Sequence, residues 1–85
     1  MQFTLYGVRY DTDGMRAIPT NDPAEPTIYI DQQSRVFVTR LEHDKAVIHW
    51  ASRTEIRRLA SRHRIGELAL IAENAGDQPP DGVHI

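Results

Sequence analysis

The sequence predicts an α+β domain in which an antiparallel β-sheet of four to five strands packs against one kinked C-terminal α-helix. Residues 27–50 alternate apolar and polar side chains in three short runs separated by turns, as an antiparallel meander does. Residues 52–74 instead repeat apolar side chains at intervals of three and four, the spacing of one helix face. Because 85 residues leave no room for a second core, we expect a single domain at 1–76 and an extended tail at 77–85.

The N-terminal segment "FTLYGVRY" (3–10) is rich in aromatic and β-branched side chains, which favours one strand with a bulge at Gly7. "DTDG" predicts a turn after it, and "MRAI" (15–18) predicts a short return strand. Three prolines in residues 19–26 exclude a helix interior and a central strand. This acidic segment is therefore predicted to be a loop.

Three alternating runs are predicted to be the strands of the meander: residues 27–31, 35–41 and 46–50. Successive side chains of a strand point to opposite faces. Val36 and Val38 are therefore expected on one face of the sheet, and Phe37 on the other.

The C-terminal helix is expected to begin at a capping box, in which Ser52 is followed three residues later by Glu55. Two apolar stripes follow that are out of register with each other. A kink or break near residues 64–66 would place both on the sheet, because glycine costs about 1 kcal/mol inside a helix. Gly76 fits the position just after the helix end.

The charges are unevenly distributed along the chain, whose net charge is −2. Residues 35–64 contain eight Lys or Arg and three Asp or Glu, between two acidic segments. This distribution indicates either internal pairing, in which the helix arginines bind the acidic loop of the same domain, or two surfaces of opposite sign. In the second case two surfaces are candidates for binding a partner. The basic one is a ridge on the helix formed by Arg53, Arg57 and Arg64. The acidic one gathers Asp11, Asp13, Asp22, Glu25 and Asp31.

The motifs of catalysis and metal binding are missing from the sequence. It contains neither a "GxSxG" elbow nor a glycine-rich phosphate loop, so we expect no enzyme activity. It has no cysteine, and its four histidines lack metal-ligand spacing, so no metal or cofactor is expected. The N-terminus lacks a basic start followed by an apolar run, so no signal peptide is expected, and no apolar run approaches the length of a membrane span. We therefore expect a cytoplasmic protein without a membrane partner.

Residues 53–74 also allow a degenerate helix-turn-helix, and a DNA-binding transcriptional regulator is the alternative function. Its second helix, "GELALIAEN", would carry Glu67 and Glu73 without any lysine or arginine. Carboxylates repel phosphates, and base contacts favour Arg, Lys, Asn and Gln. The sequence thus favours a protein partner over nucleic acid, and a homodimer is compatible with it.

Four segments carry a resemblance to a known group: "RYDTD" (9–13), "IY" (28–29), "VFV" (36–38) and "SRTEIRRLASR" (52–62). They resemble small phage and prophage accessory proteins that open with a "KRYDT(E/D)T" strand and turn. This chain lacks the glycine that precedes their aromatic strand, and no functional residue is carried over. The resemblance implies a class that includes anti-CRISPR and other anti-defence inhibitors. We therefore expect a small non-catalytic protein-binding module, encoded by a phage, that inhibits a host defence complex by occupying its surface.

Overall fold

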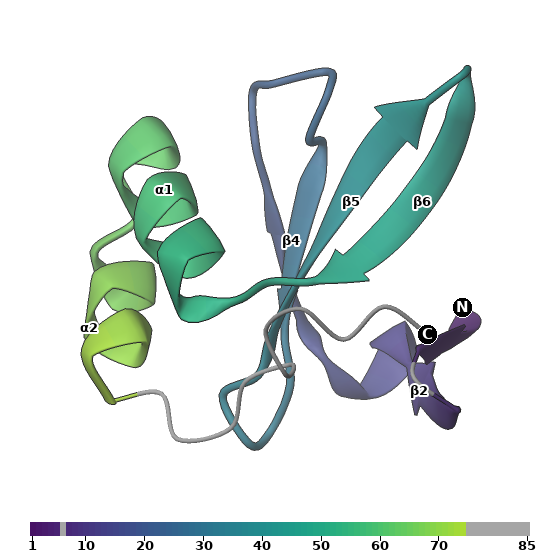
Figure 1. Ribbon diagram of the computed structural model, residues 1–85, viewed down its shortest axis with the longest axis horizontal. Coiled ribbons are helices and arrows are strands. Elements are labelled where there is room, and N and C mark those ends of the chain that lie inside the picture. The colour runs from purple at the N-terminus through teal and green to yellow at the C-terminus, as the bar shows by residue number, and fades with distance from the viewer. Residues whose placement is uncertain (6, 75–85) are drawn as a thin grey trace.

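The three predicted central strands belong to a four-stranded antiparallel sheet in the computed structural model (Figure 1). In sheet order its strands are β3 (Arg16–Pro19), β4 (Thr27–Ile30), β5 (Val36–Glu42) and β6 (Lys45–Trp50). The predicted α+β class and meander are confirmed. The structure describes residues 1–5 and 7–74, so the predicted helix end at Gly76 and the tail at 77–85 lie outside the described residues.

The two faces of this sheet bury different side chains. Ile28 pairs with Val38, and Ile30 pairs with Val36, so four aliphatic side chains share one face. They belong to the main hydrophobic core, together with side chains from the helices. Phe37 lies on the opposite face and is fully buried there. The alternation of the sequence thus predicted the two faces correctly.

The turn between β5 and β6 forces two non-glycine residues into the left-handed region. Glu42 pairs with Lys45, which leaves His43 (φ 51°) and Asp44 (φ 62°) as a two-residue turn. Hairpins of this kind favour glycine, which adopts positive φ without strain. We expect Asp44→Gly to raise the free energy of unfolding by about 0.5–1 kcal/mol in urea denaturation. Asp44→Ala should lower it, and a destabilising glycine would contradict the proposed strain.

The C-terminal segment forms two helices, α1 (Arg53–His63) and α2 (Gly66–Asn74). The backbone N–H of Glu55 donates to Ser52 Oγ at 3.2 Å, which confirms the predicted cap. Arg64 adopts the left-handed conformation (φ 55°, ψ 48°), and the N–H of Ile65 donates back to Ala60 O at 3.0 Å. The expected kink is thus a complete break at the predicted place.

The break lets both apolar stripes reach the same sheet. Leu59 of α1 and Leu68 of α2 are fully buried in the core cluster. Figure 1 shows the two helices side by side on one side of the sheet.

Within the described part of the chain, no helix has the length and apolar character of a membrane span.

The N-terminal segment is a hairpin, and the prediction of one strand with a bulge at Gly7 is wrong. Its two strands, β1 (Gln2–Leu5) and β2 (Val8–Asp11), pair antiparallel with Leu5 opposite Val8. Gly7 has φ 79°, a conformation that lets the chain reverse at once. The physical reason for the error is that a bulge and a tight turn both call for a glycine between β-forming residues.

A short 3₁₀ helix (Thr12–Gly14) then leads into β3. The predicted strand at 15–18 exists, shifted by one residue. It is not a return strand for the N-terminal segment, because it pairs with β4 instead.

An aromatic cluster attaches the N-terminal hairpin to the face of the sheet opposite the helices. Phe3 and Tyr10 stack with ring centroids 5.4 Å apart, and the Phe37 ring lies 5.4 Å from Phe3 and 5.0 Å from Tyr10. Trp50 adds a fourth ring, 5.8 Å from Phe37. The Arg35 guanidinium covers the cluster, 5.3 Å from the centre of the Tyr10 ring.

Candidate functional site

The proline-rich loop between β3 and β4 turns two carboxylates toward the end of α1. The N–H of Glu25 donates to Asp22 O at 3.1 Å, which closes a tight turn. The N–H of Ala24 donates to Asp22 Oδ1 at 2.9 Å, and the Thr20 hydroxyl donates to the carbonyl of Glu25. The loop is therefore held in one shape by its own backbone and by short polar side chains.

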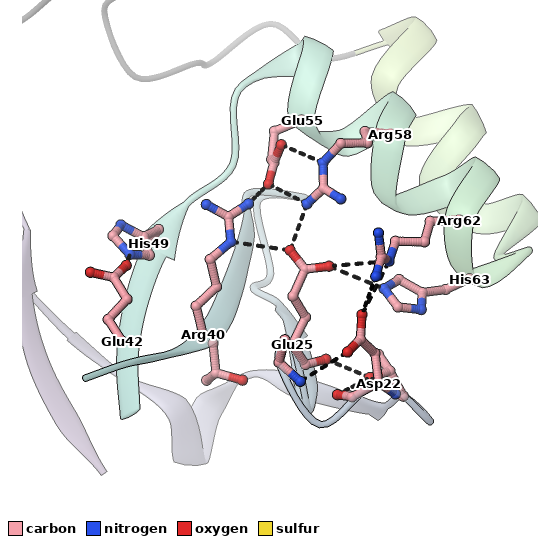
Figure 2. A network of polar contacts seen from close by, with 12 residues as sticks. Asp22, Glu25, Arg40, Glu42, His49, Glu55, Arg58, Arg62 and His63 are labelled. Carbon is pink, nitrogen blue, oxygen red and sulfur yellow. Dashed lines mark hydrogen bonds and ion pairs between the residues drawn. The ribbon is translucent and has the colours of Figure 1, made fainter. Parts of the chain in front are cut away.

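Glu25 is the centre of a buried charge cluster that joins this loop to β5 and α1 (Figure 2). The residue is only 6% exposed. Its Oε2 accepts from Arg40 Nε at 3.1 Å and from Arg58 Nη2 at 2.5 Å. Glu55 contacts the same two arginines, with Arg58 Nε donating to Glu55 Oε2 at 2.9 Å. We call Asp22, Glu25, Arg40, Glu55, Arg58, Arg62 and His63 the Glu25 cluster.

The arginines keep the Glu25 carboxylate ionised. Burial raises its pKa, but hydrogen bonds from Arg58 and Arg40 lower it by more, so that the pKa lies below its ordinary value. A buried carboxylate is tolerated only where partners replace the water that it has lost. The Glu25 carboxylate thus joins the loop to β5 through Arg40 and to α1 through Arg58. Its ionised form depends on both of these contacts.

Arg62 and His63, at the end of α1, close the cluster beside the loop. Arg62 Nη2 donates to Asp22 Oδ2 at 2.7 Å. The N–H of Ala24, and then Arg62, hold the pKa of Asp22 below its ordinary value. His63 Nε2 lies 3.5 Å from Glu25 Oε1, and Figure 2 shows the imidazole turned toward this carboxylate.

The outer side of the helix pair carries a groove between α1 and α2 with a volume of about 480 Å³. Its lining residues are Arg57, Ala60, Ser61, Arg64, Ile65, Gly66, Ala69 and Glu73. Arg57 and Arg64 are exposed, and neither forms a salt bridge with any residue that the structure describes. The groove therefore combines apolar lining residues with two guanidinium groups that have no salt-bridge partner within the described part of the chain.

The predicted basic ridge is divided by the structure. Arg57 and Arg64 line the same groove, although Arg57 lies within α1 and Arg64 directly follows its end. Arg53 is only partly exposed at the start of α1, is engaged in a contact of its own, and does not line the groove.

The predicted acidic patch is divided among three places. Asp11 and Asp13 lie near the N-terminal amino group, at 3.6 and 3.4 Å. Asp31 closes the turn between β4 and β5, where it binds Arg35 Nε at 2.6 Å. Asp22 and Glu25 belong to the Glu25 cluster. Most of these carboxylates are thus engaged within the molecule and do not form one outward surface.

The sequence left open that helix arginines pair with the acidic loop, but it did not identify the Glu25 cluster or the part of Arg40 in it. One signal pointed to Arg40. Arg40 follows Val36 and Val38 at intervals of two and so lies on the helix-facing side of β5. A charge in the register of a core face needs a buried partner. Its partner Glu25 comes from a loop, whose position the sequence pattern does not predict.

The second helix is packed and does not project from the fold. Leu68 and Ala72 are fully buried, and Glu67 binds Arg16 of β3 through both carboxylate oxygens. This hydrogen bonding by Arg16 holds the pKa of Glu67 below its ordinary value.

Comparison of the chain with protein-family models, curated proteins and solved structures gives no match.

Proposed function

We propose that this chain is a non-catalytic binding module whose α1–α2 groove takes an acidic segment of a partner protein. The observation that carries the proposal is that two exposed arginines, Arg57 and Arg64, line a largely apolar groove, and neither forms a salt bridge with a described residue. A guanidinium group binds a carboxylate through two parallel hydrogen bonds. An acidic side chain next to an apolar one would match both features of the groove.

The carboxylates of α2 favour a protein over a nucleic acid as the partner. Glu73 lines the groove itself, and α2 contains no lysine or arginine. A phosphate backbone would meet this negative charge, whereas a peptide can place a single carboxylate away from it. One observation keeps the alternative of a DNA-binding regulator open, because α1 and α2 are joined by a connection of two residues, close in length to the turn of about three or four residues in a helix-turn-helix.

The resemblance of residues 8–62 to small phage accessory proteins suggests where to look for the partner. Under this proposal the module acts as an inhibitor that occupies the surface of a host defence complex, as anti-CRISPR proteins do. Two charge-assisted contacts at the groove would set the specificity and the association rate.

Charge reversal in the groove tests the proposal. Arg57→Glu combined with Arg64→Glu should weaken binding to an acidic, leucine-containing peptide at least tenfold, because a hydrogen bond to a charged group contributes about 1.5–3 kcal/mol. The affinity is measured by fluorescence anisotropy with the labelled peptide. The control combines Arg9→Glu with Lys45→Glu, which changes the net charge equally at exposed positions outside the groove.

The groove variant and the control variant distinguish binding at the groove from a general effect of net charge and from DNA binding. Equal loss in both double variants would reduce the effect to net charge and contradict the groove. Tight binding of a 15-base-pair duplex that falls steeply with salt and needs both groove arginines would instead establish the DNA-binding alternative. A host protein retained by the wild type and the control, but not by the groove variant, would identify the partner.

A further inference from the structure

Two buried polar atoms of the Glu25 cluster face each other without a hydrogen bond. Glu25 Oε1 and His63 Nε2 are both inaccessible to solvent and have no hydrogen-bond partner among the described residues. They are 3.5 Å apart, which is longer than a normal hydrogen bond between nitrogen and oxygen. Their side chains are only 8% and 9% exposed. Buried groups of this kind normally have a partner, so the pair indicates that a further ligand belongs between them.

A third potential ligand lies beside this pair. One carboxylate oxygen of Asp22 joins Glu25 and His63 in a group whose ligand atoms all lie within 4.8 Å of one another. The turn from Asp22 to Glu25 presents both carboxylates, and the last residue of α1 presents the imidazole. The three side chains come from two elements that are fixed to each other by Arg58.

The separation of Glu25 Oε1 and His63 Nε2 fits a small divalent cation, and Asp22 lies close enough to complete the site by a small shift of its side chain. Zinc bonds to histidine nitrogen and carboxylate oxygen at about 2.0–2.2 Å, so two ligand atoms on a tetrahedral ion lie roughly 3.3–3.5 Å apart. The distance of 3.5 Å between Glu25 Oε1 and His63 Nε2 has this value. We propose that Asp22, Glu25 and His63 form a Zn²⁺ site, with a fourth position left for water.

Arg62 is the competitor of the ion in this proposal. Its guanidinium binds Asp22 Oδ2 at 2.7 Å, and its Nε lies 3.7 Å from Glu25 Oε1. The side chain is 55% exposed, and together with His63 it lines a surface hollow of about 260 Å³. Arg62 can therefore turn into solvent when the ion binds. Arg40 and Arg58 keep their contacts with the other oxygen, Oε2.

Titration of the full, tag-free chain with Zn²⁺ by calorimetry at pH 7 tests the site. The wild type should bind one ion with saturation. Loss of an outer-shell partner already costs 10–100-fold in metal affinity, so His63→Gln, which removes a ligand, should cost about 100-fold or more. Arg62→Gln should tighten binding severalfold, because it removes the competing cation. A purely structural role of the cluster would give no such gain.

His49→Gln is the matched control, since His49 is paired with a carboxylate at the surface, Glu42 Oε2 at 2.8 Å. This variant should bind Zn²⁺ as the wild type does, and circular dichroism should show that all variants are folded. NMR signals of the His63 ring should shift on addition of Zn²⁺. Absence of saturable binding to the wild type, or equal affinity in His63→Gln, would overturn the proposal.

Discussion

Glu25→Gln is expected to lower the free energy of unfolding by about 3–5 kcal/mol, as removal of one partner from a buried ion pair does. Arg40 and Arg58 would lose the carboxylate that accepts from both of them. An amide of the same shape offers one neutral oxygen in place of a charged acceptor. The loss is a large fraction of the 5–15 kcal/mol that stabilise a typical domain.

Urea denaturation followed by the fluorescence of Trp50 measures this effect. Glu73→Gln is the control, because Glu73 is exposed, and its replacement should change the free energy of unfolding by less than about 0.5 kcal/mol. A cost below about 1 kcal/mol for Glu25→Gln would mean that water already screens the cluster.

The difference in the free energy of unfolding between the wild type and Glu25→Gln is expected to depend on pH. The pKa of Glu25 is lower in the folded chain than its ordinary value of 4.5, so its contribution is fully present above that value. It is lost as the pH falls through the lower folded-state pKa, where the carboxylate takes up a proton. The difference in unfolding free energy between wild type and Glu25→Gln should therefore shrink below about pH 4.5. A difference that stays constant to pH 3 would contradict the assignment.

Phe37→Ala is the second substitution with a large expected effect, about 3–5 kcal/mol for a fully buried phenylalanine. Phe37 contacts rings of both sheets, Phe3 and Tyr10 on the hairpin and Trp50 on β6. Its loss would leave a cavity where the hairpin is attached to the four-stranded sheet.

Hydrogen exchange separates this local effect from global unfolding. The backbone amides of β1 and β2 should lose more protection than those of β5. Val8→Ala is the control in the same hairpin. Val8 is 50% exposed, so its replacement should cost less than about 1 kcal/mol. Equal loss of protection throughout the chain would show that the hairpin unfolds only together with the rest.

The sequence predicted those elements whose pattern differs between helix and strand. Alternation placed β4, β5 and β6 correctly, and the serine cap with two unmatched stripes predicted where the helices begin and break. The N-terminal hairpin was missed because its two four-residue strands differ from one longer strand only at Gly7. Local composition does not distinguish a bulge from a reversal of the chain.

The sequence predicted only part of the candidate sites, because ion pairing depends on contacts between distant segments. Arg57 and Arg64 were predicted from helical spacing, and the groove contains both. Asp22 and Glu25 were predicted as surface acids, but α1 and β5 bring arginines to them. The position of His63 beside Glu25 follows only from the fold.

Internal pairing also changes what an approaching molecule encounters. Although the chain as a whole is negative, Asp22, Glu25, Asp31 and Glu67 each have an arginine partner. Arg57 and Arg64 line the groove and form no salt bridge with any residue among 1–5 and 7–74. The net charge of the chain therefore does not predict the sign of the charge at the groove. Its encounters with anionic proteins should be faster in dilute buffer than in concentrated salt, because long-range attraction directs diffusion toward the helix pair.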